Sequence, residues 1–176
     1  MARHKPGEDP EDDEFVDRLI DALSEEDWER ARSLGNQLVE VIGDLVDRPE
    51  ELVQRTEGDP GGSIAAQAHL SEWILIFESR QQFEDAARIE RYLIDLFERD
   101  LKVSHGGRVD SPGYLDDAEA IVDQYEVRAI RFLAHMEDEA RAKEAMGLAV
   151  QSAERLRVEL DEDQKTLAVE LGVSSR

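Results

Sequence analysis

Arg128 and His135 are the two residues of this chain whose types and spacing best suit catalysis. Arginine binds anions through its guanidinium group, and histidine exchanges protons near neutral pH. The six residues AIRFLA separate the pair, and seven positions are close to two helical turns, so both side chains can share one helical face. The structural alternative places His135 near a helix end and pairs Arg128 with Asp123 or Glu126.

The spacing of Arg128 and His135 resembles the Arg-x(4–6)-His signature of the helical nuclease family associated with nucleotidyltransferase toxins. The resemblance implies that Arg128 would hold a phosphate and that His135 would assist attack by a ribose hydroxyl as acid or base. The companions that usually surround this signature, an acidic or Asn residue after the Arg and an aromatic residue soon after the His, are not clearly present. A helical ribonuclease or toxin is therefore the alternative to a non-enzymatic function.

No set of residues has the spacing of a metal or cofactor site. Cys is absent, which excludes disulfides and thiol ligands. A di-iron bundle needs Glu-x-x-His on two helices, but the residues three positions before His69, His105 and His135 are Ala66, Lys102 and Phe132. His69 and Glu72 have the reverse order, which we interpret as a structural pair. We therefore predict no metal and no cofactor.

The remaining polar motifs also have structural explanations. Asp116, Asp117 and Glu119 open an expected helix, where negative charge is favourable. Gly61-Gly62 and Gly106-Gly107 follow no strand and lack the Gly-x-x-x-x-Gly-Lys pattern of phosphate loops. The spacing of Ser and His residues arranges no nucleophile–base–orienter set. We therefore assign no catalytic residue outside the Arg128–His135 alternative.

Composition limits the class of partner. The 176 residues include 43 acidic and 21 basic side chains, for a net charge of −22. Such a chain repels nucleic acids and anionic membrane surfaces. The sequence has neither a spanning apolar run nor a secretory signal, so we expect a cytoplasmic protein without nucleic-acid or membrane partners. With few Lys among its basic residues, the chain comes either from a salt-rich cytoplasm or from a GC-rich genome.

The apolar periodicity predicts an all-α protein without a sheet. Residues 1–11 read as a disordered lead, residues 12–173 as one helical domain and residues 174–176 as a tail. Ser24 and Ser63 are expected to cap helices, and a short helix is expected over 49–55. The helices have apolar stripes, whose members include Val16, Leu19, Ile20, Leu38, Val41, Ile64, Trp73, Phe77, Phe83, Leu115, Ala118, Ile121, Phe132, Leu133, Ala142 and Leu160.

The expected helices pair into three hairpins, over about 12–48, 63–102 and 114–160. The second helices align where a polar turn precedes Trp28, Phe83 and Ala142, and Ala follows three positions later in each case. The three Ala residues lie 55 and 59 positions apart. Such a repeat predicts a stacked α-solenoid, and an up-and-down helical bundle is the alternative.

The turns and second helices resemble the tetratricopeptide-repeat family, most closely in Trp73-x3-Phe77-x5-Phe83-x2-Ala86. The family period is about 34 residues, so each repeat here carries roughly 20 more. The small residue that the family places midway along the first helix is replaced here by Leu19, Ile74 or Leu133, and the proline that the family places after the second helix is missing.

The resemblance implies a non-enzymatic interaction module that holds a peptide or a partner helix in a groove. The groove positions would include Val16, Ile20, Ile130 and Ala134, which could equally be core residues. A homo-oligomeric structural bundle without a ligand is a third possibility. The sequence thus leaves three classes of function open, and we favour the interaction module.

Overall fold

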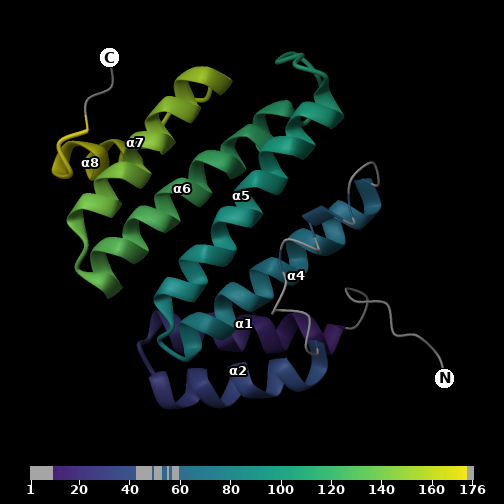
Figure 1. Ribbon diagram of the computed structural model, residues 1–176, viewed down its shortest axis with the longest axis vertical. Helices are drawn as coiled ribbons and strands as arrows, with labels where there is room; N and C mark the ends of the chain where they lie inside the picture. Colours follow the sequence, from purple (N-terminus) through teal and green to yellow (C-terminus); the bar gives the residue numbers. More distant parts are fainter. Residues whose placement is uncertain (1–9, 43–48, 50–52, 55, 57–59, 174–176) are drawn as a thin grey trace. The chain divides into compact units, whose positions relative to one another are not determined.

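The chain folds as an all-α protein, as the periodicity predicts. The computed structural model describes residues 10–42, 49, 53, 54, 56 and 60–173, and these residues contain no strand. The helices are α1 (Pro10–Ser24), α2 (Trp28–Ile42), α4 (Pro60–Ser79), α5 (Phe83–His105), α6 (Tyr114–Met136), α7 (Glu139–Leu156) and α8 (Glu162–Glu170) (Figure 1).

Two compact units divide the chain, residues 1–92 and residues 93–176, and α5 runs across the point of division. The single domain expected over 12–173 stays a prediction. The expected disordered lead lies outside the described residues up to position 9, as do most of the short helix expected over 49–55 and the tail.

Two helices begin earlier than predicted, and each begins with a proline. α1 starts at Pro10 and α4 starts at Pro60. Proline suits the first position of a helix because its fixed φ angle is helical and its missing N–H would have no partner there. The cap predicted at Ser63 is therefore wrong, since Ser63 lies within α4 and is buried.

The cap predicted at Ser24 is also wrong. Ser24 ends α1, and its hydroxyl donates to the carbonyl of Ile20 at 2.9 Å. The carboxylate of Asp27 instead accepts from the backbone N–H of Arg30 at 3.1 Å, which makes Asp27 the cap of α2. A carboxylate serves this position well because it also faces the positive end of the helix.

The turns within the hairpins share one feature of backbone conformation, a non-glycine residue with a positive φ angle. Glu26, Gln81 and Glu137 each adopt a positive φ angle, between 50° and 57°. In the first two turns the next residue donates its N–H to a carbonyl five positions back. Asp27 N–H donates to the carbonyl of Ala22 at 2.9 Å, and Gln82 N–H donates to the carbonyl of Phe77 at 2.8 Å. This left-handed residue reverses the chain and satisfies carbonyls at the helix end.

The proposed alignment of the second helices holds for two of its three members. Trp28 and Phe83 are the first residues of α2 and α5, and their rings meet edge-to-face with centroids 6.1 Å apart. α7, however, begins at Glu139, three residues before Ala142. The third turn is therefore out of register with the other two.

In the first unit, α1, α2 and α4 pack against one another. Their buried faces carry the residues that the helical periodicity selects, and Gly35 of α2 lies directly against Ser79 of α4. The rings of Trp73 and Phe77 lie 5.7 Å apart within α4, and both are buried. The large core residues of these helices are Leu19, Leu34, Leu38, Leu70, Trp73, Ile74, Ile76 and Phe77.

In the second unit, α6 and α7 lie side by side and antiparallel (Figure 1). The buried face of α7 is rich in Ala, which allows α6 to approach closely. α7 ends at Leu156, before the predicted Leu160, because Arg157 adopts a left-handed conformation and the buried Val158 donates its N–H to Ala153 at 3.0 Å. The core residues of α6 are Tyr114, Ala118, Ile121, Val122, Ala129 and Phe132.

Five members of the predicted apolar stripes lie at the surface instead of in the core. A stripe of apolar residues on a helix is often wider than the neighbouring helix can cover, so its outer members remain exposed. The five are Ile20, Val41, Ile64, Leu115 and Leu133.

Candidate functional site

The outer face of α6 carries a group of exposed apolar side chains. Val127, Ile130 and Leu133 are 43%, 45% and 39% exposed, and Ala134 beside them is exposed as well. At 100° per residue these four positions fall within about 120° of the helix circumference. We call this group the α6 patch. Single exposed apolar residues are common, whereas a contiguous group marks a surface that can bind a partner.

α6 is therefore apolar on two faces, of which only one faces the core. Ala118, Ile121, Val122 and Ala129 are buried on one side of the helix, and the α6 patch lies on the other side. The sequence analysis assigned Phe132 and Leu133 to one apolar stripe. Adjacent residues of a helix point about 100° apart, so the two side chains lie on different faces of α6.

Carboxylates lie at both ends of the α6 patch. Asp123 precedes it by about one turn of α6, Glu126 stands directly before it in the sequence, and Glu137 follows it. Asp123 and Glu137 are exposed, and Glu126 is half-buried. The outer face of α6 is thus an apolar group between two acidic ends.

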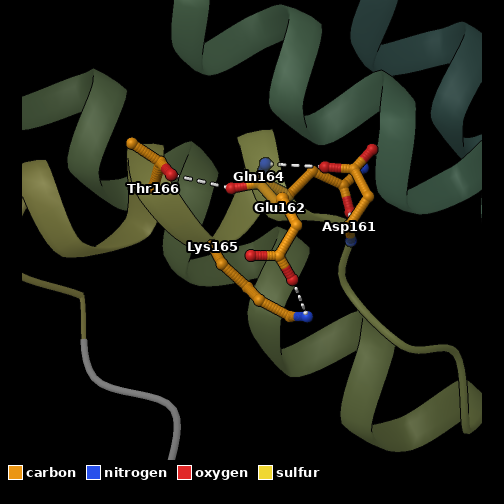
Figure 2. Close-up of polar contacts among 5 residues, drawn as sticks. All are labelled: Asp161, Glu162, Gln164, Lys165 and Thr166. Atoms are coloured by element: carbon orange, nitrogen blue, oxygen red, sulfur yellow. Dashed lines mark hydrogen bonds and ion pairs between the residues drawn. The ribbon is translucent and has the colours of Figure 1, made fainter.

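Gln164 of α8 fixes the first acidic end. Its side-chain nitrogen Nε2 donates to Asp123 Oδ1 at 2.9 Å and to Glu126 Oε2 at 3.0 Å. Figure 2 shows the capping box in which the same residue takes part: Gln164 N–H donates to Asp161 Oδ1 at 2.8 Å, and Asp161 N–H donates to Gln164 Oε1 at 3.1 Å. One buried amide side chain therefore joins the start of α8 to α6.

The carboxyl group of Glu126 has a raised pKa. Burial is the largest cause, and the charges of Asp161, Asp123 and Asp163 act in the same direction, while the hydrogen bond from Gln164 opposes them. Burial and like charges both disfavour the ionised form of a carboxyl group. The like charges of Asp123, Asp161 and Asp163 show that negative charge gathers at this end of the α6 patch.

Three of the four expected groove positions are exposed, and the fourth is half-buried. Ile20 is 43% exposed, Val16 is half-buried, and Ile130 and Ala134 are exposed. The positions at which the family places a small residue behave differently, since Leu19 and Ile74 are buried and Leu133 is exposed. The alternative that these positions belong to the core is therefore wrong for Ile20, Ile130 and Ala134, whereas the half-buried Val16 fits either interpretation.

Arg128 and His135 lie on α6, seven positions apart, as the spacing predicts. The guanidinium of Arg128 lies over the ring of Phe132, 5.0 Å from its centroid, and the guanidinium of Arg141 also lies over that ring, at 4.7 Å. Such cation–π contacts hold an arginine against an aromatic face. His135 is exposed near the end of the helix, and the carboxylates of Asp123 and Glu126 accept from Gln164.

His105 joins Ser111 and Asp117 in a cluster that the sequence reading missed. The buried imidazole of His105 bonds through Nδ1 to Ser111 Oγ and through Nε2 to Asp117 Oδ2 at 2.8 Å. The ring of Tyr114 meets that of His105 edge-to-face at 5.4 Å. The partners lie six and twelve positions after His105, across the loop from α5 to α6, so helical spacing could not reveal them. The sequence feature that could have indicated this cluster is the Gly106-Gly107 pair, where the chain reverses with positive φ angles.

The His105 cluster contains the residue types of a catalytic triad but has a different arrangement. Ser111 Oγ donates to the carbonyl of Arg108 at 3.0 Å, so the hydroxyl proton points away from the imidazole. The serine, the imidazole and the carboxylate thus join one loop, one helix end and one helix start through these hydrogen bonds. The cluster therefore acts as a clasp that ties the end of α5 to the start of α6.

The remaining candidates are structural. His69 Nδ1 lies 3.6 Å from Glu72 Oε2 on α4, which agrees with the interpretation of these two residues as a structural pair. Among the residues that the structure describes, no group of three or more His, Asp or Glu side chains is placed to hold a metal ion. No described helix combines the length and the apolar character needed to span a bilayer.

Comparisons with protein-family models, with curated proteins and with solved structures found no match. The class of this protein therefore follows from its own fold and surface. The chain is an all-α helical protein with an exposed apolar patch on α6.

Proposed function

We propose that this protein is a non-enzymatic interaction module that binds a partner protein or peptide through the outer faces of its helices. One observation carries the proposal: Val127, Ile130 and Leu133 form a contiguous apolar group at the surface of α6. Exposed apolar area is costly in water, and burial against a partner recovers that cost.

The Ile20 side chain of α1 is a second candidate anchor, because the family resemblance places it among the groove positions. It lies in the first unit and is 43% exposed although the periodicity places it with the apolar residues of its helix. Partners that bind helices recognise such residues as anchors at the surface. Ile20 and Ile130 are thus the two positions whose replacement should reduce binding.

A capture experiment tests the proposal. The wild-type protein is immobilised, exposed to lysate of the source cells at matched salt, and cross-linked before mass spectrometry. We expect a discrete partner that the Ile20→Ser/Ile130→Ser variant retains poorly and that the Arg128→Ala/His135→Ala variant retains fully. Equal retention by all three proteins, or no partner at all, would contradict the proposal.

The same samples separate the two other classes of function. A ribonuclease predicts loss of lysate RNA that depends on Arg128 and His135. A homo-oligomeric bundle predicts a multimeric mass by light scattering that the Ile130→Ser substitution reduces. Either outcome without a retained partner would replace the interaction module by that class.

A further inference from the structure

We infer that the α6 patch binds a cationic amphipathic helix of a partner protein, an inference that rests on the proposed function and names its partner by chemistry. The apolar side chains would meet the apolar face of the incoming helix. Its Lys or Arg residues would meet the carboxylates at the two ends of the patch.

The dimensions of the outer face fit one short helix. The patch runs from Val127 to Ala134, and its acidic ends extend from Asp123 to Glu137. At 1.5 Å per residue these spans are about 10 Å and about 21 Å. A partner of about four turns therefore matches the face, with apolar anchors in its two central turns and basic residues about one turn beyond them.

The charges of the face select a cationic occupant. Asp123, Glu126 and Glu137 surround the patch, and Asp161 and Asp163 add negative potential at Glu126. Within α6 the cation Arg128 lies about 100° around the axis from Val127, on another side of the helix. Arg131 borders the patch, about 40° from Val127, but it is buried and only 3% exposed. A basic partner gains attraction there, and complementary charges also accelerate association.

The same charges disfavour a second copy of this chain as the occupant. Two copies would place acidic ends against each other, and each copy carries a net charge of −22. Like charges that face each other at an interface oppose association. We therefore commit to a cationic helix and treat self-association as an outcome of the test.

The probe is a synthetic 18-residue amphipathic helix with Leu on one face and Lys along its borders. A scrambled peptide of equal composition controls for charge alone. Binding is measured by fluorescence anisotropy with the full-length protein, and the contact site is mapped from NMR amide shifts. We expect the amphipathic peptide to bind at least about tenfold more tightly than the scrambled one, because a difference of about 1.4 kcal/mol is tenfold.

Matched variants locate the site. Ile130→Ser/Leu133→Ser should weaken binding by about tenfold or more, since both anchors lose their apolar contact. Leu148→Ser is the control, because Leu148 of α7 is also 39% exposed but lies outside the patch. Asp123→Asn/Glu126→Gln should weaken binding by about threefold at low salt and less at 1 M KCl, because salt screens surface charges.

Several outcomes would overturn the inference. Equal affinity for the scrambled peptide, equal loss with Leu148→Ser, or amide shifts confined to helices other than α6 each exclude a specific site on the patch. A concentration-dependent dimer that Ile130→Ser/Leu133→Ser abolishes, without peptide binding, would assign the patch to self-association. Circular dichroism melting of each variant confirms that a loss of binding is not a loss of fold.

The two proposals fail separately. If a lysate partner depends on Ile20 and Ile130 but the cationic peptide does not bind, the interaction module stands and the chemistry assigned to its partner is wrong. If neither the lysate partner nor the peptide depends on these residues, both proposals fail.

Discussion

Gly35 shows how a single residue sets the distance between two helices. A β-carbon at this position would overlap the hydroxyl of Ser79. That hydroxyl is fully buried and donates to the carbonyl of Ile76 at 2.7 Å, so it cannot move away freely. α2 and α4 therefore approach closely at this point only because Gly35 has no side chain.

Replacing Gly35 by Ala should destabilise the protein, whereas Gly147→Ala should stabilise it. Both changes gain helix propensity worth up to about 1 kcal/mol, but the overlap at Gly35 adds an overpacking cost of about 1–3 kcal/mol. A β-carbon at Gly147 of α7 meets nothing within 4 Å, which makes it the matched control. Urea unfolding measures both free energies, and equal values for the two variants would show that Ser79 yields without cost.

The raised pKa of Glu126 links stability to pH. Because the native state holds this proton more readily than the unfolded chain, stability falls as pH rises from about the ordinary value of 4.5 through the higher native value. Glu126→Gln removes the charge and keeps an oxygen that can accept from Gln164. We expect a slightly higher melting temperature than wild type at pH 7 and no advantage near pH 4. An advantage that persists unchanged at pH 4 would contradict this assignment.

At the scale of elements, the His105 cluster closes the long connection between α5 and α6. The imidazole lies buried at the end of α5, and its partners Ser111 and Asp117 lie in the loop and in the first turn of α6. Nothing in the helical periodicity predicts this connection, because its members belong to one helix end, one loop and another helix. The clasp holds the loop by hydrogen bonds that a shorter side chain cannot make.

Replacing His105 by Ala should open the loop to proteases. Arg108 is exposed within it and offers a tryptic site. Loss of about 1.4 kcal/mol of local stability would raise cleavage about tenfold when opening precedes cutting. His135→Ala is the matched control, since it removes an exposed imidazole elsewhere on the chain. Trypsin digestion under native conditions, followed by mass spectrometry, measures the rate of cleavage after Arg108, and equal rates in both variants would argue against a clasp.

For the whole molecule, the dominant property is the net charge of −22. Self-repulsion of this charge destabilises the folded chain, and salt reduces the repulsion. The Debye length falls from about 10 Å at 0.1 M to about 3 Å at 1 M. Folding in a salt-rich cytoplasm stays a prediction, as does the cytoplasmic location itself.

The melting temperature should therefore rise steeply with KCl between 0.1 M and 2 M. Sucrose, which stabilises compact states without screening charge, serves as the comparison. A flat or falling melting temperature across this range would favour the alternative in which Arg replaces Lys through codon usage alone.

The sequence by itself determined the helices and most of their buried residues. Backbone hydrogen bonds within a helix are local. The 3.6-residue period therefore places Leu19 on the apolar face of α1, and Ile121 and Phe132 on the apolar face of α6, wherever these helices lie. Turn residues are equally local, which is why the turns before Trp28 and Phe83 were found where the structure has them.

Only the tertiary structure decided which apolar faces are covered. Ile121 and Ile130 of α6 are equally apolar, yet one is fully buried and the other is 45% exposed. The same holds for the His105 clasp and for the contact of Gly35 with Ser79, whose members are 6 to 44 positions apart. Periodicity records that a face is apolar, but burial depends on which other helix reaches it, and that choice is made by contacts between residues distant in the chain.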